Sequence, residues 1–237
     1  MRSEKNDLPP LTDPLGETLH QLRLNGSLYC RSELTAPWGL EIPAITGKMM
    51  FHVITSGNCF LQLGNEEPLS LPQGSLALVP HGLGHRLLSD ISAKSEQLFD
   101  IPVEIISKRY EIMRHGGKGA LTELTCGVVS FDHVAGQRLI AQLPKVLLID
   151  NWDLSNNSWL QSTLEYIARE ARTLKPGGET IITHLADILV IQAIRAWLER
   201  APEAQQGWLA ALRDRQIGVA LAAIHREPER DWTVDSL

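Results

Sequence analysis

The chain has 237 residues, which is enough for one large domain or two small ones around a sizeable core. Apolar residues make up 43% and charged residues 21%, an ordinary balance for a globular protein. The formal net charge of −6 argues against a nucleic-acid-binding surface within these residues, because neutralising phosphates requires clustered Lys and Arg.

The first predicted elements are a helix and a series of short strands. An Asp-Pro start followed by leucines at helical spacing predicts a helix over Asp13–Leu24. From Ser27 to about Ile149, turn residues separate short apolar or alternating runs, which predicts strands at Ser27–Leu34, Met49–Thr55, Cys59–Leu63, Pro68–Leu71, Ser75–Val79 and Leu121–Phe131. Many short strands with close turns are typical of an antiparallel sandwich or barrel.

One connection in this region is long and runs from Asp90 to Ala120. It contains a candidate strand at Ile101–Ile106, after which it is rich in glycine and basic residues. Long irregular segments inside compact domains are either functional lids or simply mobile. Of the two, we expect a mobile, solvated segment here.

Helical periodicity replaces the strand pattern after Asn151. Apolar residues recur on one face between Leu160 and Ala171, and a more apolar helix follows from Ile181 to Trp197. The two predict a helical hairpin that packs on the sheet or on another subunit, and both alternatives stay open. Polar residues interrupt the second helix and the N-terminus lacks an apolar segment. We therefore expect no membrane span or signal peptide, and a cytoplasmic protein.

A third helix is predicted over Asp214–His225, because Pro228 disfavours helical backbone in the residue before it. Thr233 is a good N-cap with Asp235 in the following turn, so a further helix is predicted to begin just before Leu237. A helix that short is unstable alone, and we expect the chain to be a fragment of a longer protein.

Several blocks along the chain are informative together. They are Phe51–Gly57 (FHVITSG), Gly74–His85 (GSLALVPHGLGH), Leu124–Gly127 (LTCG) with Phe131-Asp132, Leu143-Pro144 and Leu185–Arg195 (LADILVIQAIR). In this order they resemble the cupin-like sensor domain in one branch of the AraC-type transcription regulators, although Ser75 stands where that branch usually has Asp. The series from Gly207 to Trp232-Thr233 is similar to the start of the AraC-type helix-turn-helix domain.

The resemblance covers nearly the whole chain and implies an α+β fold, a cupin-like antiparallel β-barrel or sandwich followed by a helical hairpin. It implies an effector-sensing barrel over residues 1–150, a linker and dimerisation hairpin over 151–205, and the start of a DNA-binding domain over 206–237. The implied partners are an unknown small-molecule effector and a second copy of the chain. DNA would be bound only through the part beyond Leu237, because recognition helices read the base edges.

Four residues stand out as candidate metal ligands, namely His52, His81, His85 and Cys126. Three imidazole nitrogens and one thiolate would make a tetrahedral site for zinc or another divalent transition metal, and the glycines between two of the histidines relax the turn. The spacing is not that of a zinc finger, but all four positions fall on motif residues of the family that the chain resembles. The alternative is that they are separate, half-buried polar residues.

An effector pocket is expected inside the small barrel, as in barrels generally. Its candidate lining residues are Trp38, Met50, Ile54, Phe60 and Gln62, with Gln62 supplying a polar contact. The alternative for each is simple core packing or, for Gln62, solvent.

Two classes of function remain. The first is a regulator's sensor without enzymatic activity; a pure dimerisation module is compatible with it. The second is a stand-alone metal-dependent cupin enzyme, which needs an open coordination position. Enzymatic cupins typically hold their metal with an H-x-H, a Glu and a third His, and the absence of H-x-H favours the regulator. Cys30 and Cys59 are expected to be inert buried thiols.

Overall fold

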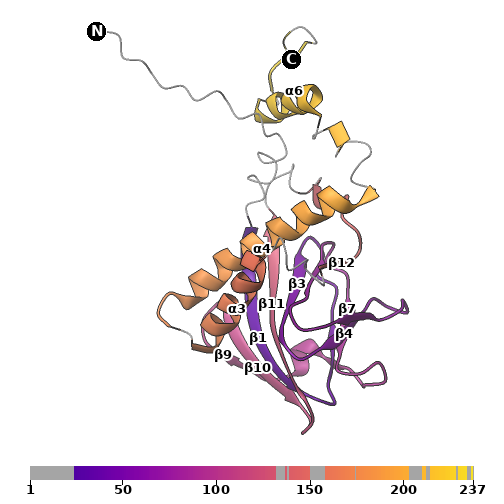
Figure 1. Ribbon diagram of the computed structural model, residues 1–237, viewed down its shortest axis with the longest axis vertical. Helices are drawn as coiled ribbons and strands as arrows, with labels where there is room; N and C mark the ends of the chain where they lie inside the picture. The colour runs from indigo at the N-terminus through magenta and orange to yellow at the C-terminus, as the bar shows by residue number, and fades with distance from the viewer. Residues whose placement is uncertain are drawn as a thin grey trace.

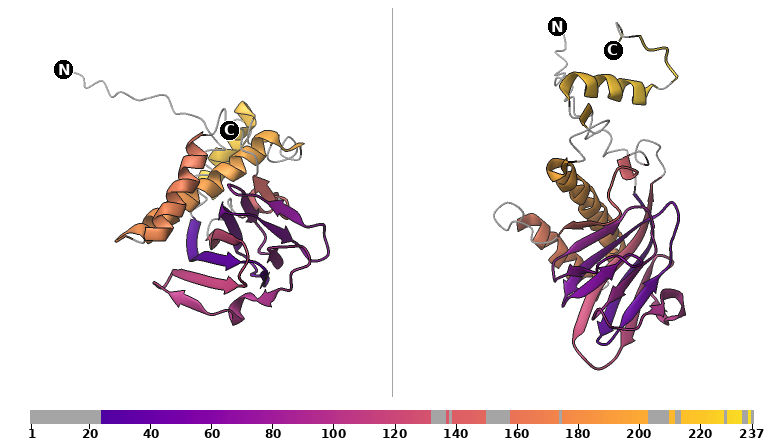
Figure 2. Two further views of the ribbon diagram at one scale, coloured as in Figure 1. Left: turned by 60° about the horizontal axis from the view of Figure 1, so that its bottom comes forward. Right: turned by 90° about the vertical axis from the view of Figure 1, so that its right-hand side faces the viewer.

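Two β-sheets face each other in the computed structural model, and two helices cover the outer side of the larger sheet (Figures 1 and 2). The strands lie between residues 24 and 149 and the helices follow them. The structure describes residues 24–131, 137, 139–149, 158–173, 175–202, 210–211, 214–227, 229–233 and 236.

The larger sheet has seven strands in the order β12-β6-β3-β11-β1-β10-β9. Their bounds are β1 (Leu24–Thr35), β3 (Met49–Ser56), β6 (Leu76–Val79), β9 (Val103–Ile105), β10 (Tyr110–Gly116), β11 (Leu121–Phe131) and β12 (Leu147–Ile149). Neighbouring strands are antiparallel except β1 and β10, which run parallel. All six strands predicted from the sequence are present across the two sheets.

The smaller sheet has five strands in the order β5-β4-β7-β2-β8. They are β2 (Gly39–Ile42), β4 (Cys59–Gln62), β5 (Leu69–Leu71), β7 (His85–Leu88) and β8 (Glu96–Gln97), and the short helix η1 (Leu98–Asp100) follows. In the described part of the chain the two sheets stay separate, so the fold is a sandwich with mixed strand directions rather than a closed antiparallel barrel.

Apolar side chains on both faces of the larger sheet form two cores. In β3 all residues from Met49 to Ile54 are buried, because alternate side chains enter opposite cores. Met49, Phe51 and Val53 belong to the helix-side core, which lies between the larger sheet and the helices. Met50 and Ile54 belong to the inter-sheet core. Burying each such side chain contributes about 1.5–3 kcal/mol, which fixes the register of β3 between its neighbours.

The packing around Gly127 in β11 explains why the sequence block Leu124–Gly127 ends in glycine. A Cβ atom at this position would lie 2.5 Å from Cε1 of Phe51 and 3.1 Å from Cδ1 of Tyr29. These two rings pack with their centroids 6.1 Å apart in the helix-side core. The glycine therefore gives the aromatic pair its space, while its neighbour Cys126 is on the opposite face of the strand.

The predicted helical hairpin is present as α3 (Ser158–Thr173) and α4 (Gly178–Arg200). Ile182, Leu189 and Ile194 of α4 are buried in the helix-side core, so the hairpin packs on the sheet (Figure 1). The segment Gly178–Glu199 has a mean hydropathy of 1.5 and is long and apolar enough to cross a membrane by composition alone. In this fold one side of it lies on the sheet.

The prediction of a mobile, solvated segment over Asp90–Ala120 is wrong where the segment forms regular structure. The segment contains β8, η1, β9 and β10, and β10 pairs with β1 inside the larger sheet. In the sequence, the charge of Arg114 is typical of a solvated loop. Its guanidinium group forms ion pairs with Glu33 of β1 at 2.9 Å and with Glu104 of β9 at 2.6 Å. The charge therefore supports pairing between strands on the exposed face of the sheet.

The third predicted helix is α6 (Arg215–Arg226), where Asp214 Oδ1 accepts hydrogen bonds from two backbone N–H groups of the first turn. At Thr233, the predicted N-cap, the backbone N–H donates to Ser236 Oγ. The helix predicted over Asp13–Leu24 lies outside the described residues, apart from Leu24, which begins β1.

Candidate functional site

The inner face of the larger sheet carries a row of polar side chains. Cys126 of β11 lies directly opposite Cys30 of β1 on one side and opposite His52 of β3 on the other. Cross-strand partners share a face, so all three side chains enter the space between the two sheets. Cys30 and Cys126 are half-buried against the inter-sheet core, and His52 is 3% exposed.

His85 joins this row from the opposite sheet, where it begins β7. Its Nε2 lies 2.8 Å from Nε2 of His52, and the two rings meet edge to face with centroids 4.9 Å apart. On the other side of the His52 ring, Nδ1 lies 3.1 Å from Cys126 Sγ. We call this arrangement the Cys126–His52–His85 chain; it links the two sheets through their interior.

Hydrogen-bond chemistry decides which atom donates and which accepts at each contact of the Cys126–His52–His85 chain. His85 Nδ1 lies 2.9 Å from the carbonyl oxygen of Leu83, which only accepts, so this nitrogen carries the proton. His85 Nε2 is then bare in the neutral ring and accepts from the Nε2–H of His52. Nδ1 of His52 is bare in turn and accepts from the thiol of Cys126.

Burial keeps all three groups neutral. It lowers the pKa of His52 well below its ordinary value, and the neighbouring His85 lowers it further. Burial also lowers the pKa of His85. It raises the pKa of the Cys126 thiol well above its usual range, with Cys30 and Cys59 adding to the effect. The Cys126–His52–His85 chain is therefore a network of neutral groups that are hydrogen-bonded to one another, and it is not a thiolate–imidazolium pair.

His81, the fourth predicted ligand, lies apart from this network. Its Nε2 lies 2.9 Å from the carbonyl oxygen of Leu143. Between the two histidines Gly82 has φ of +62°, and a Cβ there would lie 2.0 Å from the carbonyl oxygen of Ile45. The glycine serves this close backbone contact, and the turn separates the two imidazoles instead of making them converge.

The four predicted ligands do not fit one metal ion as they are placed. Cys126 and His85 contact different nitrogens of His52, on opposite sides of its ring, whereas zinc ligands all lie about 2.0–2.3 Å from one centre. The part of the chain that the structure describes holds no group of three or more His, Cys, Asp or Glu placed to bind a metal ion.

The zinc site thus stays a prediction, and metal analysis of the purified chain tests it. Near-stoichiometric zinc that is lost in a His81→Ala, His85→Ala double variant would support the four-ligand set. Zinc-free protein purified without chelators would contradict it.

The five predicted effector-contacting residues divide between two faces. Trp38, Met50 and Ile54 are buried together in the inter-sheet core. Phe60 and Gln62 alternate with buried residues of β4 and point to the other side of the smaller sheet. There Gln62 Oε1 accepts a hydrogen bond from Arg86 at 2.6 Å. The structure therefore brings three of the five together.

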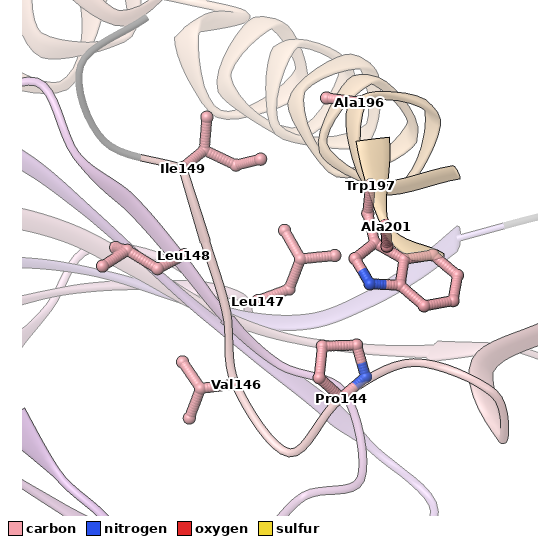
Figure 3. Close-up of a pocket in the computed structure, with 8 residues that line it drawn as sticks. All are labelled: Pro144, Val146, Leu147, Leu148, Ile149, Ala196, Trp197 and Ala201. Atoms are coloured by element: carbon pink, nitrogen blue, oxygen red, sulfur yellow. The ribbon is translucent and has the colours of Figure 1, made fainter. Parts of the chain in front are cut away.

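The described residues line several cavities, two of which include residues of α4 or of the Asp90–Ala120 segment. One, of about 350 Å³, lies between β12 and the end of α4, and Figure 3 shows Leu147 and Trp197 facing each other across it. The other, of about 700 Å³, includes Trp38 and residues of the Asp90–Ala120 segment. Sequence reasoning missed the second cavity because it treated that segment as a solvated connection. The apolar residues Tyr110, Ile112 and Met113, all three of which are buried, were the available signal.

Comparisons with known proteins agree with the fold. A family model described as Cupin matches residues 13–199. The chain is 30% identical over 230 residues to a putative AraC-like transcription regulator of Streptomyces lividans, covering 95% of this chain and 72% of that protein. It is 28% identical over 227 residues to the HTH-type transcriptional regulator AlkR of Acinetobacter baylyi, covering 95% and 74%.

A structural likeness is more distant. The crystal structure of ToxT from Vibrio cholerae with bound unsaturated fatty acid is 10% identical, with a TM-score of 0.40, covering 88% of this chain and 66% of that one. A likeness at this level adds nothing to the assignment. The cupin model matches residues 13–199, and the AraC-like regulator of Streptomyces lividans matches 95% of the sequence. Together they show that this chain belongs to the AraC family of transcription regulators and carries their cupin part.

Proposed function

We propose that this chain is the effector-sensing and dimerising part of a cytoplasmic AraC-type transcription regulator, without enzymatic activity of its own. The observation that carries the proposal is the match of 95% of the chain to proteins named as transcription regulators. These relatives favour sensing over a stand-alone metal-dependent enzyme. The net charge of −6 agrees with DNA contact being left to a helix-turn-helix part beyond Leu237.

Helix α4 is the element that connects sensing with the C-terminal part. At its start, Glu179 Oε2 accepts a hydrogen bond from Ser107 Oγ at 2.6 Å, next to β10. At its end, Trp197 and Ala201 line the cavity beside β12 (Figure 3). The helix therefore lies across the larger sheet from the β9–β10 side to the opposite edge, and a shift of the sheet reaches residues 201 and beyond.

An effector acts in this scheme by binding two arrangements of sheet and helix with different affinity. A ligand with equal affinity for both arrangements shifts nothing, however tightly it binds. A shift in DNA affinity of 5–150-fold requires a coupling of only about 1–3 kcal/mol. A few contacts between α4 and the sheet are enough to supply such a difference.

A reporter strain controlled by the full-length regulator tests the proposal. Carboxylates, sugars, amines and metal salts are screened for a change in reporter output, and each active compound is titrated into the purified chain by calorimetry. We expect at least one compound to act in both assays and to be recovered unchanged. Chemical turnover of that compound by the purified chain would overturn the non-enzymatic assignment, and a reporter that is insensitive to every compound bound would overturn sensing.

The outer side of the helical hairpin is where we place the dimer contact. Ile181 and Ile188 of α4 and Tyr166 of α3 are 36%, 43% and 38% exposed. Residues 181 and 188 are two turns apart on one side of α4, so their side chains form an apolar stripe away from the sheet. An exposed stripe of this kind is typical of a protein–protein contact.

Substitution Ile188→Glu tests this contact, since it introduces a charge into the stripe. We expect analytical ultracentrifugation to show a dimer for the parent chain and a weakening of dimerisation by at least tenfold for the variant. Ile91→Glu is the matched control, because Ile91 is 59% exposed in a loop of the sandwich. A monomeric parent chain, or equal effects of both variants, would contradict the proposed contact.

A further inference from the structure

The row of polar side chains on the inner face of the larger sheet extends beyond Cys126. Cys30 of β1 is paired with Cys126 of β11 on one side and with Glu111 of β10 on the other. Glu111 stands between two residues of the helix-side core along β10, so its own side chain faces the smaller sheet. Two thiols are thus cross-strand neighbours, with a carboxylate next to one and the imidazole of His52 next to the other.

Each of the two thiols has a hydrogen-bond acceptor of its own. The Cys126 thiol donates to Nδ1 of His52 at 3.1 Å. The Cys30 thiol donates to the carboxylate of Glu111; burial raises the pKa of this carboxyl group, and the hydrogen bond partly opposes the rise. A thiol that binds a metal ion loses its proton, and here an acceptor is in place for each of the two protons.

The row is open to solvent on the side of β9 and β10. Cys30, Cys126 and Glu111 are only half-buried, although their side chains face the smaller sheet. Ile105 of β9, the cross-strand partner of Glu111, is 76% exposed. An ion therefore has an entry path along the inner face of the sheet, past Glu111 to the two sulfurs.

The spacing of β1 and β11 decides what the thiol pair holds. Directly opposite residues of antiparallel strands have Cβ atoms about 4.5–5.5 Å apart, whereas a disulfide needs about 3.5–4.5 Å. The two strands are paired from Leu24 to Thr35, so a local approach at Cys30 is opposed by the pairing on both sides. An ion with metal–sulfur bonds of about 2.3 Å holds two sulfurs up to about 4.6 Å apart, which suits the wider spacing.

The number of ligands selects the class of ion. Zinc takes four ligands, and the described residues hold no group of three or more His, Cys, Asp or Glu placed to bind a metal ion. Copper(I) and silver(I) are soft ions that prefer thiolates, and two thiolates in a line are enough to bind them. The thiol pair therefore fits a soft monovalent ion better than zinc.

We propose that Cys30 and Cys126 bind one soft monovalent metal ion of the copper(I) class between β1 and β11, as a two-thiolate complex. The two thiol protons pass to the Glu111 carboxylate and to Nδ1 of His52, so the ion and the imidazolium together balance the charge of the two thiolates. The zinc site predicted from the sequence is different, because it includes His81 and leaves Cys30 out. The copper(I) site does not depend on the proposed sensing function.

Anaerobic titration of the reduced 237-residue chain with copper(I) tests the site. The ion is supplied as its bicinchoninate complex, which outcompetes weak surface binding, and ultraviolet absorption follows the formation of copper(I) thiolate. We expect one copper(I) per chain, with sulfur neighbours in the X-ray absorption spectrum. Retention of all the copper by bicinchoninate, or a shell of nitrogen and oxygen only, would overturn the site.

Single thiol variants identify the ligands, and circular dichroism checks that each variant is folded. Cys30→Ala is expected to abolish stoichiometric uptake. Cys59→Ala is the matched control and should keep it, because Cys59 is a buried thiol of the smaller sheet that lies opposite Leu71. His81→Ala should keep it as well, since His81 belongs only to the predicted zinc set. Equal uptake by the two cysteine variants would contradict a site at the thiol pair.

A conservative change at Glu111 provides the last readout. Glu111→Gln keeps the shape of the side chain but removes the acceptor for the Cys30 proton, so we expect copper(I) affinity to fall by about tenfold. The sulfur shell in the X-ray absorption spectrum should stay the same, because Glu111 positions a ligand without contacting the ion. An unchanged affinity would contradict the assigned role of this carboxylate.

Discussion

Buried polar groups lie on both faces of the larger sheet, and the two faces treat them differently. Between the sheets, each member of the Cys126–His52–His85 chain has its hydrogen-bond partner. Under α4, by contrast, Tyr110 Oη and Asp187 Oδ1 are buried without a partner among the described residues, whereas the inter-sheet core holds one such atom among them, Trp38 Nε1. An unpaired buried polar atom costs about 1–3 kcal/mol, whereas a complete network makes a core rigid.

The difference separates a fixed contact from an adjustable one. The two sheets are joined by a network that any sliding would break, so the sandwich moves as a unit. At the contact between α4 and the sheet, a small displacement of the helix that paired either atom would be favourable. A signal from the sandwich is therefore more easily passed by moving α4 than by deforming the sandwich.

The largest expected effect comes from cutting the inter-sheet network. Substitution His52→Ala leaves the Cys126 thiol and His85 Nε2 without their partners in the core and opens a cavity, so we expect a loss of about 3 kcal/mol in the free energy of unfolding. Urea denaturation measures the loss. His81→Ala is the control, since His81 is half-buried with one hydrogen bond, and about 1 kcal/mol is expected. Equal losses would show that the network does not hold the sheets together.

A second effect is the pH dependence of the same network. Because burial lowers the pKa of His52 and His85, the unfolded state takes up protons first as the pH falls. The stabilisation is complete above the ordinary pKa of about 6.5 and is lost below it, by up to about 1.4 kcal/mol per pH unit for each histidine. Urea denaturation at pH 7.5, 6.5 and 5.5 measures the slope.

This slope is best measured in an Asp187→Asn background, because titration of Asp187 changes the free energy of unfolding with pH in the opposite direction. In that background we expect stability to fall by about 2 kcal/mol between pH 7.5 and 5.5. His85→Gln is expected to flatten the curve. A slope that is the same with and without His85 would assign the pH dependence to other groups.

The smallest expected effect is on the helix side. Burial raises the pKa of Asp187 to about 6, with His184 partly opposing the effect. The protonated form is therefore favoured by folding, and this stability is present at low pH and lost as the pH rises through about 6. Asp187→Asn stays neutral, so at pH 7.5 it should raise the free energy of unfolding by about 1 kcal/mol, after allowance for its partial exposure.

The gain from Asp187→Asn should disappear at pH 4, where the carboxyl group of the parent chain is protonated as well. His184→Ala serves as the control, because the imidazole is 74% exposed and 4.0 Å from the Asp187 carboxylate. We expect it to change stability by less than about 0.5 kcal/mol. A destabilised Asp187→Asn variant at pH 7.5 would mean that the carboxylate has a favourable role under α4.

Sequence patterns predicted those strands whose apolar residues and bounding turns are visible within the strand itself, including β1 and β11, which pair about one hundred residues apart. The alternation in β3, β4 and β6 is bounded by turn residues, and a single strand suffices to show it. The missed strand β10 pairs with β1, about eighty residues earlier, and its charges are explained only by that pairing. The boundaries proposed at residues 150 and 205 remain predictions.

In the candidate site too, the sequence identified residues, whereas the fold determined how they are placed. The sequence blocks identified His52, His85 and Cys126, which the fold does bring together. They could not exclude His81, because the direction of its side chain depends on how Gly82 packs against Ile45. Cys30 was expected to be an inert thiol; that it lies beside Cys126 follows from the register of β1 and β11, which no local pattern contains.

The position of β1 also has a consequence for biosynthesis. This first described strand pairs on one side with β10 and on the other with β11, so neither of its edges finds a partner until residues 110–131 have left the ribosome. Strand edges without partners associate readily with other chains, and pairings between distant segments form slowly. The nascent chain is therefore most exposed to aggregation while these residues are still in the exit tunnel, and chaperone dependence should drop once β11 has emerged.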